Sequence, residues 1–527
     1  MPLKTADSAS AAPLHIAKGR GASLSALNLA VGLVLAITLI PFIYIALRAF
    51  EKPLPEILNL LLRAKTLQVL ATTTALLLIV VAVNIFIGTL MAAGLHFIRL
   101  PKAHLFILPT ILPLAIPSYV FTYTWLALIP SLSGLFAAAF ILILTTMPYM
   151  LLAILVSLRR LDSSLIEVAR TLGLSRFKIF IRVILPQIRS SISAGALLSG
   201  LYVLSDFGAV SLLNVETLTV SIQNMFKASY DRSAASVISI LLILASVVFI
   251  AFNERLKDSD SKENISKRLM AKNIRINNSA LKASLLFSVA LYTTLAVVLP
   301  IYVLISRFVG NPNPIDFIKL IETALSTISV AALGALIALL MSAPLGLLLS
   351  SSAGKYSRLA ERIILVGHAL PGVIIGLALV SLGSKLGPLY QSTLLLAFAY
   401  ALLFLAKAVA SMTSALQLVP SALKEVAATL GKSKSKVTTS VVFPIALPSI
   451  GLGTLLVFLT AMKELPATLM LRPTGMDTLA TQIWSYASIN RFNDAAPYAL
   501  LLVLIAAIPT FLLSAPRNPS EKVEISQ

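Results

Sequence analysis

Three ionisable residues, Asp206, Lys463 and Glu464, interrupt long apolar stretches of the sequence. An ionisable side chain at the centre of a bilayer costs about 2.5–3.5 kcal/mol on insertion scales, so such residues are candidates for function. Carboxylate oxygens are hard ligands, and two of them together could bind or attract a metal cation. The structural alternative is that each carboxylate marks the outer end of a helix, or that Lys463 pairs with Glu464 or Asp206 and holds helices together.

Cysteine and histidine chemistry finds no support in the sequence. The chain has no Cys, which excludes disulfides, thiolate metal sites and cysteine nucleophiles. His368 and Lys407 each stand alone in an apolar stretch, where a lone His is more often a packing residue than a ligand. No metal-ligand spacing connects the four His residues, which are His15, His96, His104 and His368. We therefore predict no catalytic residue, no metal site and no cofactor.

A short stretch, Gly431-Lys432-Ser433, matches the end of a phosphate-binding loop. That motif requires a second glycine five positions earlier, and Val426 occupies the position. The match fails, so we predict that the chain does not bind ATP itself and is not an enzyme.

The composition indicates a membrane protein. Hydrophobic residues make up 58% of the 527 residues and charged residues 12%, with a mean hydropathy of +0.94. Soluble domains have about 45–50% apolar residues. About 20 apolar residues cross a bilayer as a helix, so we predict an all-α membrane protein with about twelve transmembrane helices. The predicted helices begin near Leu24, Leu70, Leu105, Leu135, Ile192, Ala234, Ala283, Ala324, Ile363, Thr393, Ser449 and Ala495.

The positions of the basic residues predict the topology. The formal net charge of +21 could suggest nucleic-acid binding, but Lys and Arg gather in alternate loops, which is typical of the cytoplasmic side of a membrane protein. This places both termini in the cytoplasm. The first apolar stretch is too long for a signal peptide and is read as a retained span. We predict an N-terminal tail over 1–23, membrane domains over 24–252 and 283–514, a cytoplasmic linker over 253–282 and a C-terminal tail over 515–527.

The two predicted membrane domains repeat one another at a fixed offset. Gly195 aligns with Gly453, and Asp206 aligns with Glu464. At the same offset lie the further pairs Glu167 and Glu425, Ala169 and Ala427, Gly173 and Gly431, Pro186 and Pro444, and Pro113 and Pro371. Proline and glycine rarely coincide by chance in unrelated apolar segments. We therefore predict a duplicated six-helix unit, and because six is even, the two halves are parallel.

The most similar part of the repeat is a polar loop that reads as a short helix, a Gly turn and a basic helix ending at proline. In the first copy Leu165, Val168, Ala169 and Leu172 are predicted to share one face, and Gly173 ends the helix. One interpretation is a docking element for a cytoplasmic partner. The other is an amphipathic helix whose basic residues bind lipid headgroups.

The residues of this loop resemble the EAA loop of ABC importer permeases. They are Glu167, Ala169, Gly173, Val183, Leu185 and Pro186 in the first copy, and Glu425, Ala427, Gly431, Val441 and Pro444 in the second. Phe443 stands where the family prefers Leu, and Val168 and Val426 replace the first Ala of the motif. The segments Ser205 to Gln223 and Lys463 to Trp484 resemble the corresponding regions of ferric-iron importer permeases.

The resemblance implies a type I importer membrane domain with both halves fused in one chain. It implies that the two loops dock into two ATP-binding cassette ATPase subunits, and that a periplasmic or lipid-anchored binding protein delivers the substrate from outside. The chain would sit in the lipid of the bacterial inner membrane, without a nucleic-acid partner. Asp206, Lys463 and Glu464 would be candidates for the translocation pathway of ferric iron. Importers of thiamine or phosphonates share much of this layout and remain open as alternatives.

Two other classes of membrane protein are alternatives. A secondary transporter of the major-facilitator kind also has twelve spans in parallel halves, but it predicts a Gly-Asp-Arg-Gly type loop that the segment Gly94 to His104 lacks. A membrane-embedded enzyme requires clustered His or acidic residues, and the 21 acidic residues lie mostly in loops. Neither class explains the doubled loop.

Overall fold

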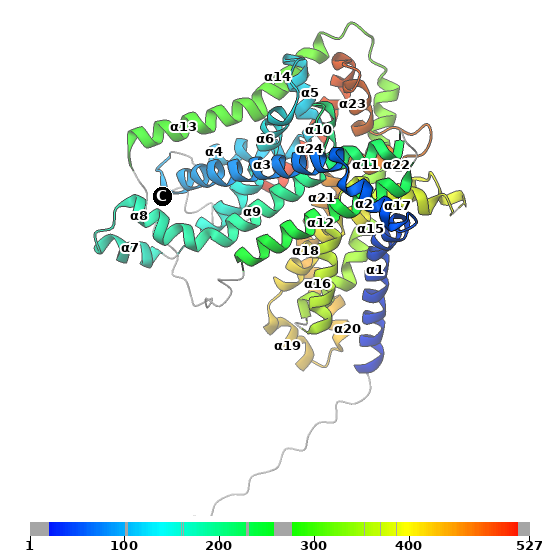
Figure 1. Ribbon diagram of the computed structural model, residues 1–527. Helices are drawn as coiled ribbons and strands as arrows, with labels where there is room; N and C mark the ends of the chain where they lie inside the picture. The colour runs from blue at the N-terminus through cyan, green and yellow to red at the C-terminus, as the bar shows by residue number, and fades with distance from the viewer. Residues whose placement is uncertain are drawn as a thin grey trace, which may run out of the picture.

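The computed structural model describes residues 20–100, 104–159, 161, 163–227, 231–257, 277–351, 354–368, 370–385 and 387–514, and their regular structure is helical (Figure 1). The first half contains α1 Arg20–Ala49, α2 Leu54–Leu62, α3 Ala64–Phe97, α4 His104–Ile111, η1 Leu112–Ala115, α5 Ser118–Leu128, α6 Leu135–Leu158, α7 Ser163–Thr171, α8 Arg176–Ile179, η2 Phe180–Ile184, α9 Leu185–Ser205, α10 Gly208–Leu212, α11 Leu218–Lys227 and α12 Arg232–Lys257. The second half contains α13 Ser279–Thr293, η4 Thr294–Val298, α14 Leu299–Val309, α15 Phe317–Ser351, α16 Lys355–His368, α17 Gly372–Gly383, η5 Gly387–Leu389, α18 Thr393–Gln417, α19 Ser421–Thr429, α20 Lys434–Val437, η6 Thr438–Val442, α21 Phe443–Ala461, α22 Pro466–Leu471, α23 Leu479–Ala487 and α24 Phe492–Ser514.

The predicted all-α membrane fold is confirmed, but fewer helices qualify as spans than the twelve predicted. In the described part of the chain, eight helices are long and apolar enough to cross a bilayer, or ten if each of two bent pairs forms one span. The two predicted segments outside this set are α9 and α24. Helix α9 carries Arg189 and several serines, which lower its hydropathy, and the part of α24 whose side chains the structure describes, Phe492–Ala507, is shorter than the other spans.

Proline creates the two bent pairs. Helices α4 and α5 meet at 94° and helices α16 and α17 at 95°. Pro117 precedes α5 and Pro371 precedes α17, both with extended backbone, because a proline disfavours helical geometry at the residue before it and lacks the N–H that would continue the helix. The structural counterpart of Pro371 is therefore Pro117. The predicted pairing of Pro371 with Pro113 is wrong, and Pro113 lies instead within η1.

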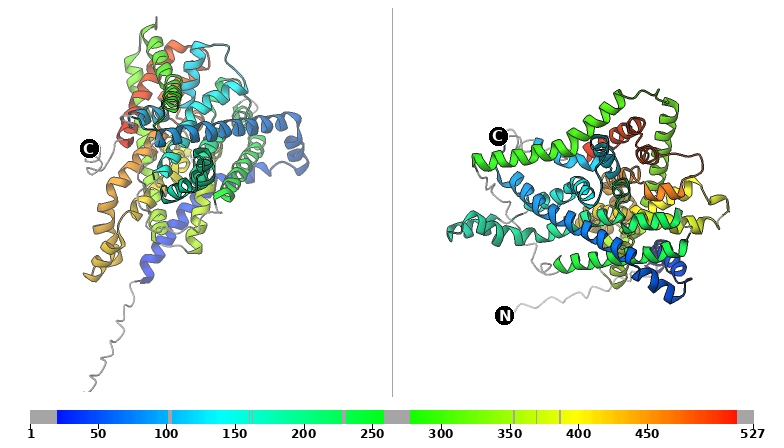
Figure 2. Two further views of the ribbon diagram at one scale, coloured as in Figure 1. Left: turned by 90° about the vertical axis from the view of Figure 1, so that its left-hand side faces the viewer. Right: turned by 45° about the horizontal axis from the view of Figure 1, so that its top comes forward.

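The first long helix of each half packs against the other half. Helix α1 contacts α15, α16 and α17, and its residues Val31, Val34 and Leu35 share a buried cluster with Leu345 and Ile364. Helix α13 lies along α3 and α4, and α14 packs on α5 (Figures 1 and 2). The two halves are thus interlocked and complete one another's cores.

Small and polar residues allow close packing inside each half. A methyl group added at Gly88 of α3 would meet Met150 of α6 at 2.7 Å, and one at Gly346 of α15 would meet Met412 of α18 at 2.3 Å. The buried Asn84 side chain also donates to Thr146 at 2.6 Å across α3 and α6. Small residues and buried hydrogen bonds of this kind hold helices together where lipid offers no hydrophobic drive for association.

The predicted domain boundaries differ slightly from the helix ends. Helix α12 continues to Lys257, five residues into the predicted linker over 253–282, and α13 begins at Ser279. The remaining linker residues 258–276, the C-terminal tail and most of the N-terminal tail lie outside the described residues. The division into two membrane domains with a linker remains a prediction.

Candidate functional site

The repeated polar loop folds alike in both halves, as α7 with α8 and as α19 with α20. Glu167 and Glu425 are exposed, whereas Ala169 and Ala427 are 4% and 6% exposed and pack inward. The buried alanines fix the side of each short helix that faces its own half. The glutamates of the motif therefore point away from the bundle.

Both short helices end in the same glycine turn. Gly173 and Gly431 have φ angles of +77° and +80°, which residues with a Cβ rarely adopt. In the first copy the N–H of Leu174 donates to the carbonyl of Ala169 at 3.1 Å, and the N–H of Gly173 donates to that of Arg170 at 3.0 Å. The second copy repeats both bonds. These are the two hydrogen bonds of a Schellman motif, so the predicted C-terminal role of the glycines is confirmed.

Each short helix presents an apolar stripe to the outside. We define the stripe as Leu165, Val168 and Leu172 in α7, which are 50%, 56% and 74% exposed. The stripe in α19 is Leu423, Val426 and Leu430, which are 44%, 56% and 76% exposed. The predicted face is thus corrected in one respect, because Ala169 faces inward while the three large residues face outward. Exposed apolar side chains in regular array are typical of a surface that another molecule covers.

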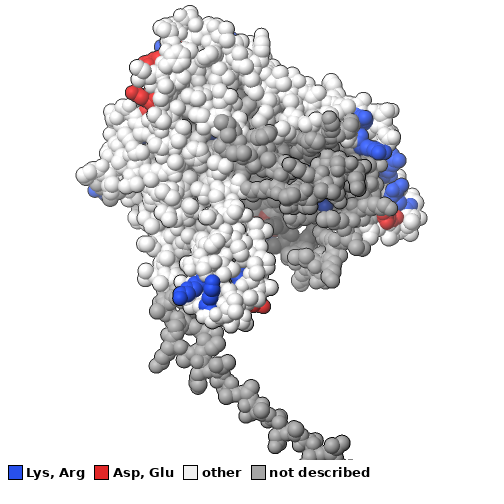
Figure 3. Space-filling model, turned by 180° about the vertical axis from the view of Figure 1, so that it is seen from behind, with Lys and Arg blue, Asp and Glu red and all other residues white. Residues whose placement is uncertain are grey.

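Basic residues surround both stripes. Figure 3 shows Lys and Arg gathered at two places on one face of the molecule, at its right-hand edge and at its lower end. These are the ends at which Figure 1 places α7–α8 and α19–α20. Exposed basic residues of the first loop include Arg170, Arg176 and Lys178, and those of the second include Lys432 and Lys436. Each stripe is therefore an apolar strip on a positively charged end of the molecule.

A continuous helical run connects each loop to an acidic residue. Residues 176–205 form α8, η2 and α9 without interruption, and residues 434–461 form α20, η6 and α21. The π-helical turns η2 and η6 each end two residues before a proline, Pro186 or Pro444, whose ring and missing N–H disturb the regular ladder of hydrogen bonds. Asp206 directly follows the first run, and Glu464 lies three residues beyond the second. Each loop thus lies at one end of a helical run that has a carboxylate at, or just beyond, its other end.

The Asp206 side chain is 7% exposed and fully engaged by hydrogen-bond donors. Its Oδ1 accepts from the N–H groups of Ala209 at 3.0 Å and Val210 at 3.3 Å, at the start of α10. Its Oδ2 accepts from the hydroxyl of Ser118 on α5. A carboxylate in this position offsets the unpaired N–H groups and the positive end of a helix dipole.

Glu464 is 8% exposed, and its carboxylate likewise accepts hydrogen bonds from N–H groups at the start of a short helix in the second half. Its carboxylate accepts from the N–H groups of Ala467 and Thr468, both at 2.9 Å, and from the Thr468 hydroxyl at 2.6 Å. Lys463 pairs with neither acidic residue. Its Nζ donates instead to the carbonyl of Leu114 in the first half, at 2.7 Å.

The structure brings the two acidic segments to one junction between the halves. A methyl group added at Gly208 of α10 would lie 3.3 Å from the side chain of Leu465. The Phe207 ring lies beside that of Trp484 of α23, with centroids 6.1 Å apart, and the indole N–H donates to Ser211. The described residues contain no cluster of three or more His, Asp or Glu placed to hold a metal. The side chain of His368 lies outside the described residues, and Lys407 lies on α18.

The segment that follows each acidic residue is fastened to a long helix by a matching bond. The N–H of Leu218 donates to Thr73 Oγ1 at 3.0 Å, and the N–H of Leu479 donates to Thr327 Oγ1 at 2.8 Å. Both threonines are buried. The alignment at a fixed offset does not pair Thr73 with Thr327 or Leu218 with Leu479, because insertions before and after the acidic residues shift the register. Hydroxyl residues within apolar helices are the signal that could have found them.

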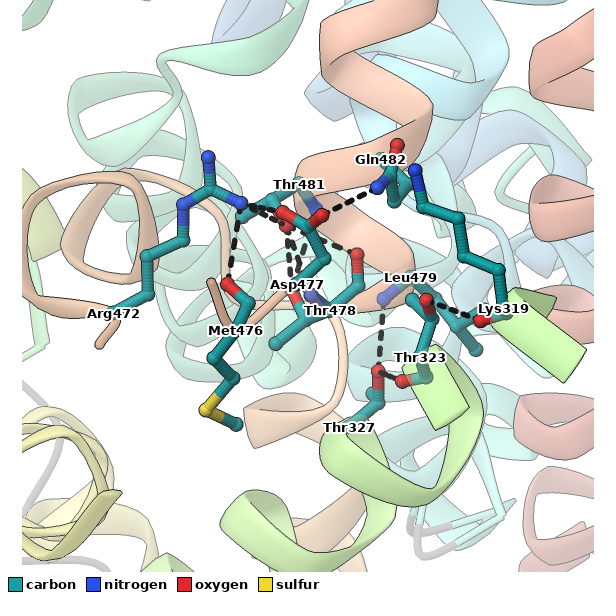
Figure 4. Close-up of polar contacts among 10 residues, drawn as sticks. All are labelled: Lys319, Thr323, Thr327, Arg472, Met476, Asp477, Thr478, Leu479, Thr481 and Gln482. Atoms are coloured by element: carbon teal, nitrogen blue, oxygen red, sulfur yellow. Dashed lines mark hydrogen bonds and ion pairs between the residues drawn. The ribbon is translucent and has the colours of Figure 1, made fainter. Parts of the chain in front are cut away.

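The second half reinforces this fastening with a charged loop (Figure 4). Arg472 pairs with Asp477 and donates to the carbonyl of Met476 at 3.3 Å. Partial burial lowers the pKa of the Arg472 guanidinium, which nevertheless stays charged at any physiological pH. Thr478 and Thr481 form a capping box at the start of α23. The loop from 472 to 478 is thus held rigidly against the junction.

These bonds predict the effect of substitutions at Asp206. We expect Asp206→Ala to lower the melting temperature of the detergent-solubilised protein, because a buried N–H left without an acceptor costs about 1–3 kcal/mol. Asp206→Asn keeps an acceptor for the N–H groups at the start of α10 and should cost much less. Equal melting temperatures of the two variants in a thermal unfolding assay would contradict the capping role.

Comparison with known proteins places the chain in a family. The sequence model of the binding-protein-dependent transport system inner membrane component matches twice, over residues 84–259 and 342–516. The chain belongs to this family, the permease subunits of ABC importers, with two family domains in one polypeptide.

Three relatives are informative. The chain is 31% identical over 499 residues to the Fe(3+)-transport system permease protein FbpB 2 of Haemophilus influenzae, an alignment that covers 93% of this chain and 97% of the relative. It is 26% identical to the chloroplastic sulfate permease 2 of Chlamydomonas reinhardtii, over 43% of this chain and 67% of that protein. It is 30% identical to the molybdenum transport system permease protein ModB of Mycobacterium tuberculosis, over 36% of this chain and 76% of that protein.

Proposed function

We propose that the chain forms the translocation pathway of an ATP-driven importer of ferric iron in the inner membrane. The observation that carries the proposal is the alignment with an Fe(3+)-transport permease over nearly the full length of both proteins. The sulfate and molybdenum relatives align with less than half of this chain. They support the permease role but not the choice of ferric iron as the substrate.

In this proposal, two ATPase subunits bind the two loops. The repeated loop with Glu167, Ala169 and Gly173, and its counterpart with Glu425, Ala427 and Gly431, would each place an apolar stripe in a groove of one subunit. The stripes are equivalent in the two halves, which supports a pair of like subunits. The basic ends of the molecule support a cytoplasmic location for the loops and both termini.

The same proposal assigns the junction between the halves to the pathway. A substrate-binding protein would deliver the ion from outside, to the end of the molecule near Asp206, Lys463 and Glu464. ATP-driven closure of the ATPases would push both loops together, and the helical runs 176–205 and 434–461 would turn the two acidic segments against each other. The halves would thereby alternate between inward-open and outward-open states.

The test is uptake of ⁵⁵Fe³⁺ into cells with and without this protein, with thiamine, a phosphonate and sulfate as controls. Loss of iron uptake alone in cells without the protein is the expected result. Unchanged iron uptake with loss of a control substrate would overturn the assignment to iron while leaving the permease role intact.

A further inference from the structure

The basic helix of the first loop carries apolar side chains that the second loop lacks. Phe177 of α8 is 72% exposed, and Ile181, one turn further along the same helical run, is 43% exposed. At the offset of the repeat their counterparts are Ser435 and Thr439, which are exposed polar residues. The stripes on α7 and α19 are alike, so the two loops differ in the helices that follow the glycine turns.

The fold of the permease does not use the Phe177 ring. The inward side of this helical run is filled by other apolar residues, such as Ile179 and Ile188, which are 5% and 0% exposed. Phe177 lies instead between the exposed basic residues Arg176 and Lys178. Aromatic and arginine side chains are enriched where proteins bind one another. The ring is therefore a candidate for contact with another molecule.

The edge of the bilayer near this loop is marked by α12. Its apolar span ends at Glu254 and Arg255, which are both exposed. Directly before them, the carbonyl of Asn253 accepts a hydrogen bond from the hydroxyl of Ser193 on α9 at 3.1 Å. This bond places Ser193 at the same level as the end of the span.

Lipid does not reach Phe177 from that level. Ser193 and Phe177 are 16 positions apart in the helical run 176–205, which is about 24 Å at 1.5 Å per residue. A helix tilted by about 40° still carries the ring about 18 Å beyond the edge, whereas the headgroup layer is only about 5–7 Å thick. Figures 1 and 2 show α7 and α8 lying beyond the end of α12. A protein partner, not the bilayer, is therefore the candidate to cover the ring.

We propose that the two loops bind their ATPase subunits with unequal affinity, because Phe177 gives the first loop an apolar anchor that the second loop lacks. The inference rests on the proposed function, which places one ATPase subunit on each loop, and adds that the first loop is occupied first. Leu172 and Phe177 lie on either side of the same glycine turn and are 74% and 72% exposed. A subunit that covers the end of the stripe is therefore next to the ring.

The test measures each loop separately. The permease is reconstituted in phosphatidylcholine nanodiscs and titrated, without ATP, with the purified ATPase subunit of the same importer. Val426→Asp leaves only the first loop able to bind, and Val168→Asp leaves only the second. The first loop alone should bind with a Kd at least about tenfold lower than the second loop alone, which corresponds to about 1.4 kcal/mol.

Exchanging the two residues should exchange the affinities. Added to Val426→Asp, the substitution Phe177→Ser should raise the Kd to about that of the second loop. Added to Val168→Asp, the substitution Ser435→Phe should lower the Kd about tenfold. Phe136→Ser is the matched control, because Phe136 is 80% exposed and lies on α6, outside both loops. It should leave the Kd unchanged.

Equal affinities of the two loops, or a Kd that Phe177→Ser does not change, would overturn the proposal. An effect of Phe177→Ser that appears only after phosphatidylglycerol is added to the nanodiscs would assign the ring to anionic lipid and would also overturn it. The proposed function fails in a different way. It is overturned if the ATPase does not bind the unaltered permease, or if it still binds when both aspartates are present.

Discussion

Replacing Gly173 and Gly431 together by proline is expected to abolish uptake while the protein remains inserted in the membrane. Proline fixes φ near −65°, whereas these glycines have φ angles of +77° and +80°, so neither turn can form. Each substitution also removes the N–H that donates to Arg170 or Ala428 at 3.0 Å. The apolar stripes would then lose their orientation relative to the helical runs behind them. The measurement is ⁵⁵Fe uptake, with the amount of protein in the membrane determined in parallel.

Asparagine provides the matched control for these glycines. Asn visits the left-handed region more readily than other residues with a Cβ, and a methyl group at either glycine meets nothing within 4 Å. Gly173→Asn with Gly431→Asn should therefore retain much of the uptake. Normal uptake by the proline variant would refute the docking role of both loops.

The double variant Val168→Asp with Val426→Asp should prevent the ATPase subunits from binding. Both valines are 56% exposed at the centre of their stripes, so an aspartate there does not disturb the core of the permease. In the complex, however, each aspartate would be buried against an apolar groove without a partner, which costs several kcal/mol. The expected result is that the ATPase no longer co-purifies with the permease and that uptake is lost.

Leu58 on α2 offers a control for the valines, because it is 47% exposed, apolar and outside both loops. Leu58→Asp should leave co-purification of the ATPase unchanged. Retention of the ATPase by the double valine variant would show that the stripes are not the docking surface. It would favour the interpretation of both loops as helices that lie on lipid.

The sequence predicted the class of fold and the repeated loops because both depend on local patterns. Apolar runs identify membrane helices from composition alone, and the Gly turn has a backbone requirement that appears directly in the residue type. The aligned pairs Glu167 with Glu425 and Gly173 with Gly431 therefore fold alike. The number of spans was less predictable, because the helix that leads to Asp206 is rich in small polar residues.

The roles of the charged residues at the junction could not be predicted from the sequence. Asp206 and Glu464 cap helices of only five and six residues, which are too short to give a periodic pattern. Lys463 donates to Leu114, a bond between residues that are 349 positions apart. The register between the halves also shifts at Pro117, where an offset that holds for the loops no longer holds. Contacts of this kind depend on tertiary arrangement, which one sequence does not reveal.

The exchange of first helices between the halves has a consequence for how the chain is made. Helix α1 leaves the ribosome long before its packing partners in the second half, since α16 begins only at Lys355. At about 5–20 residues per second, the roughly 300 residues that separate them take about 15–60 seconds to synthesise. During that interval Val31, Val34 and Leu35 can be covered only by lipid or by a chaperone. Assembly of this permease is therefore completed late, and a ribosome that stalls within the second half leaves a first half whose opening helix contacts α12 but lacks its partners in the second half.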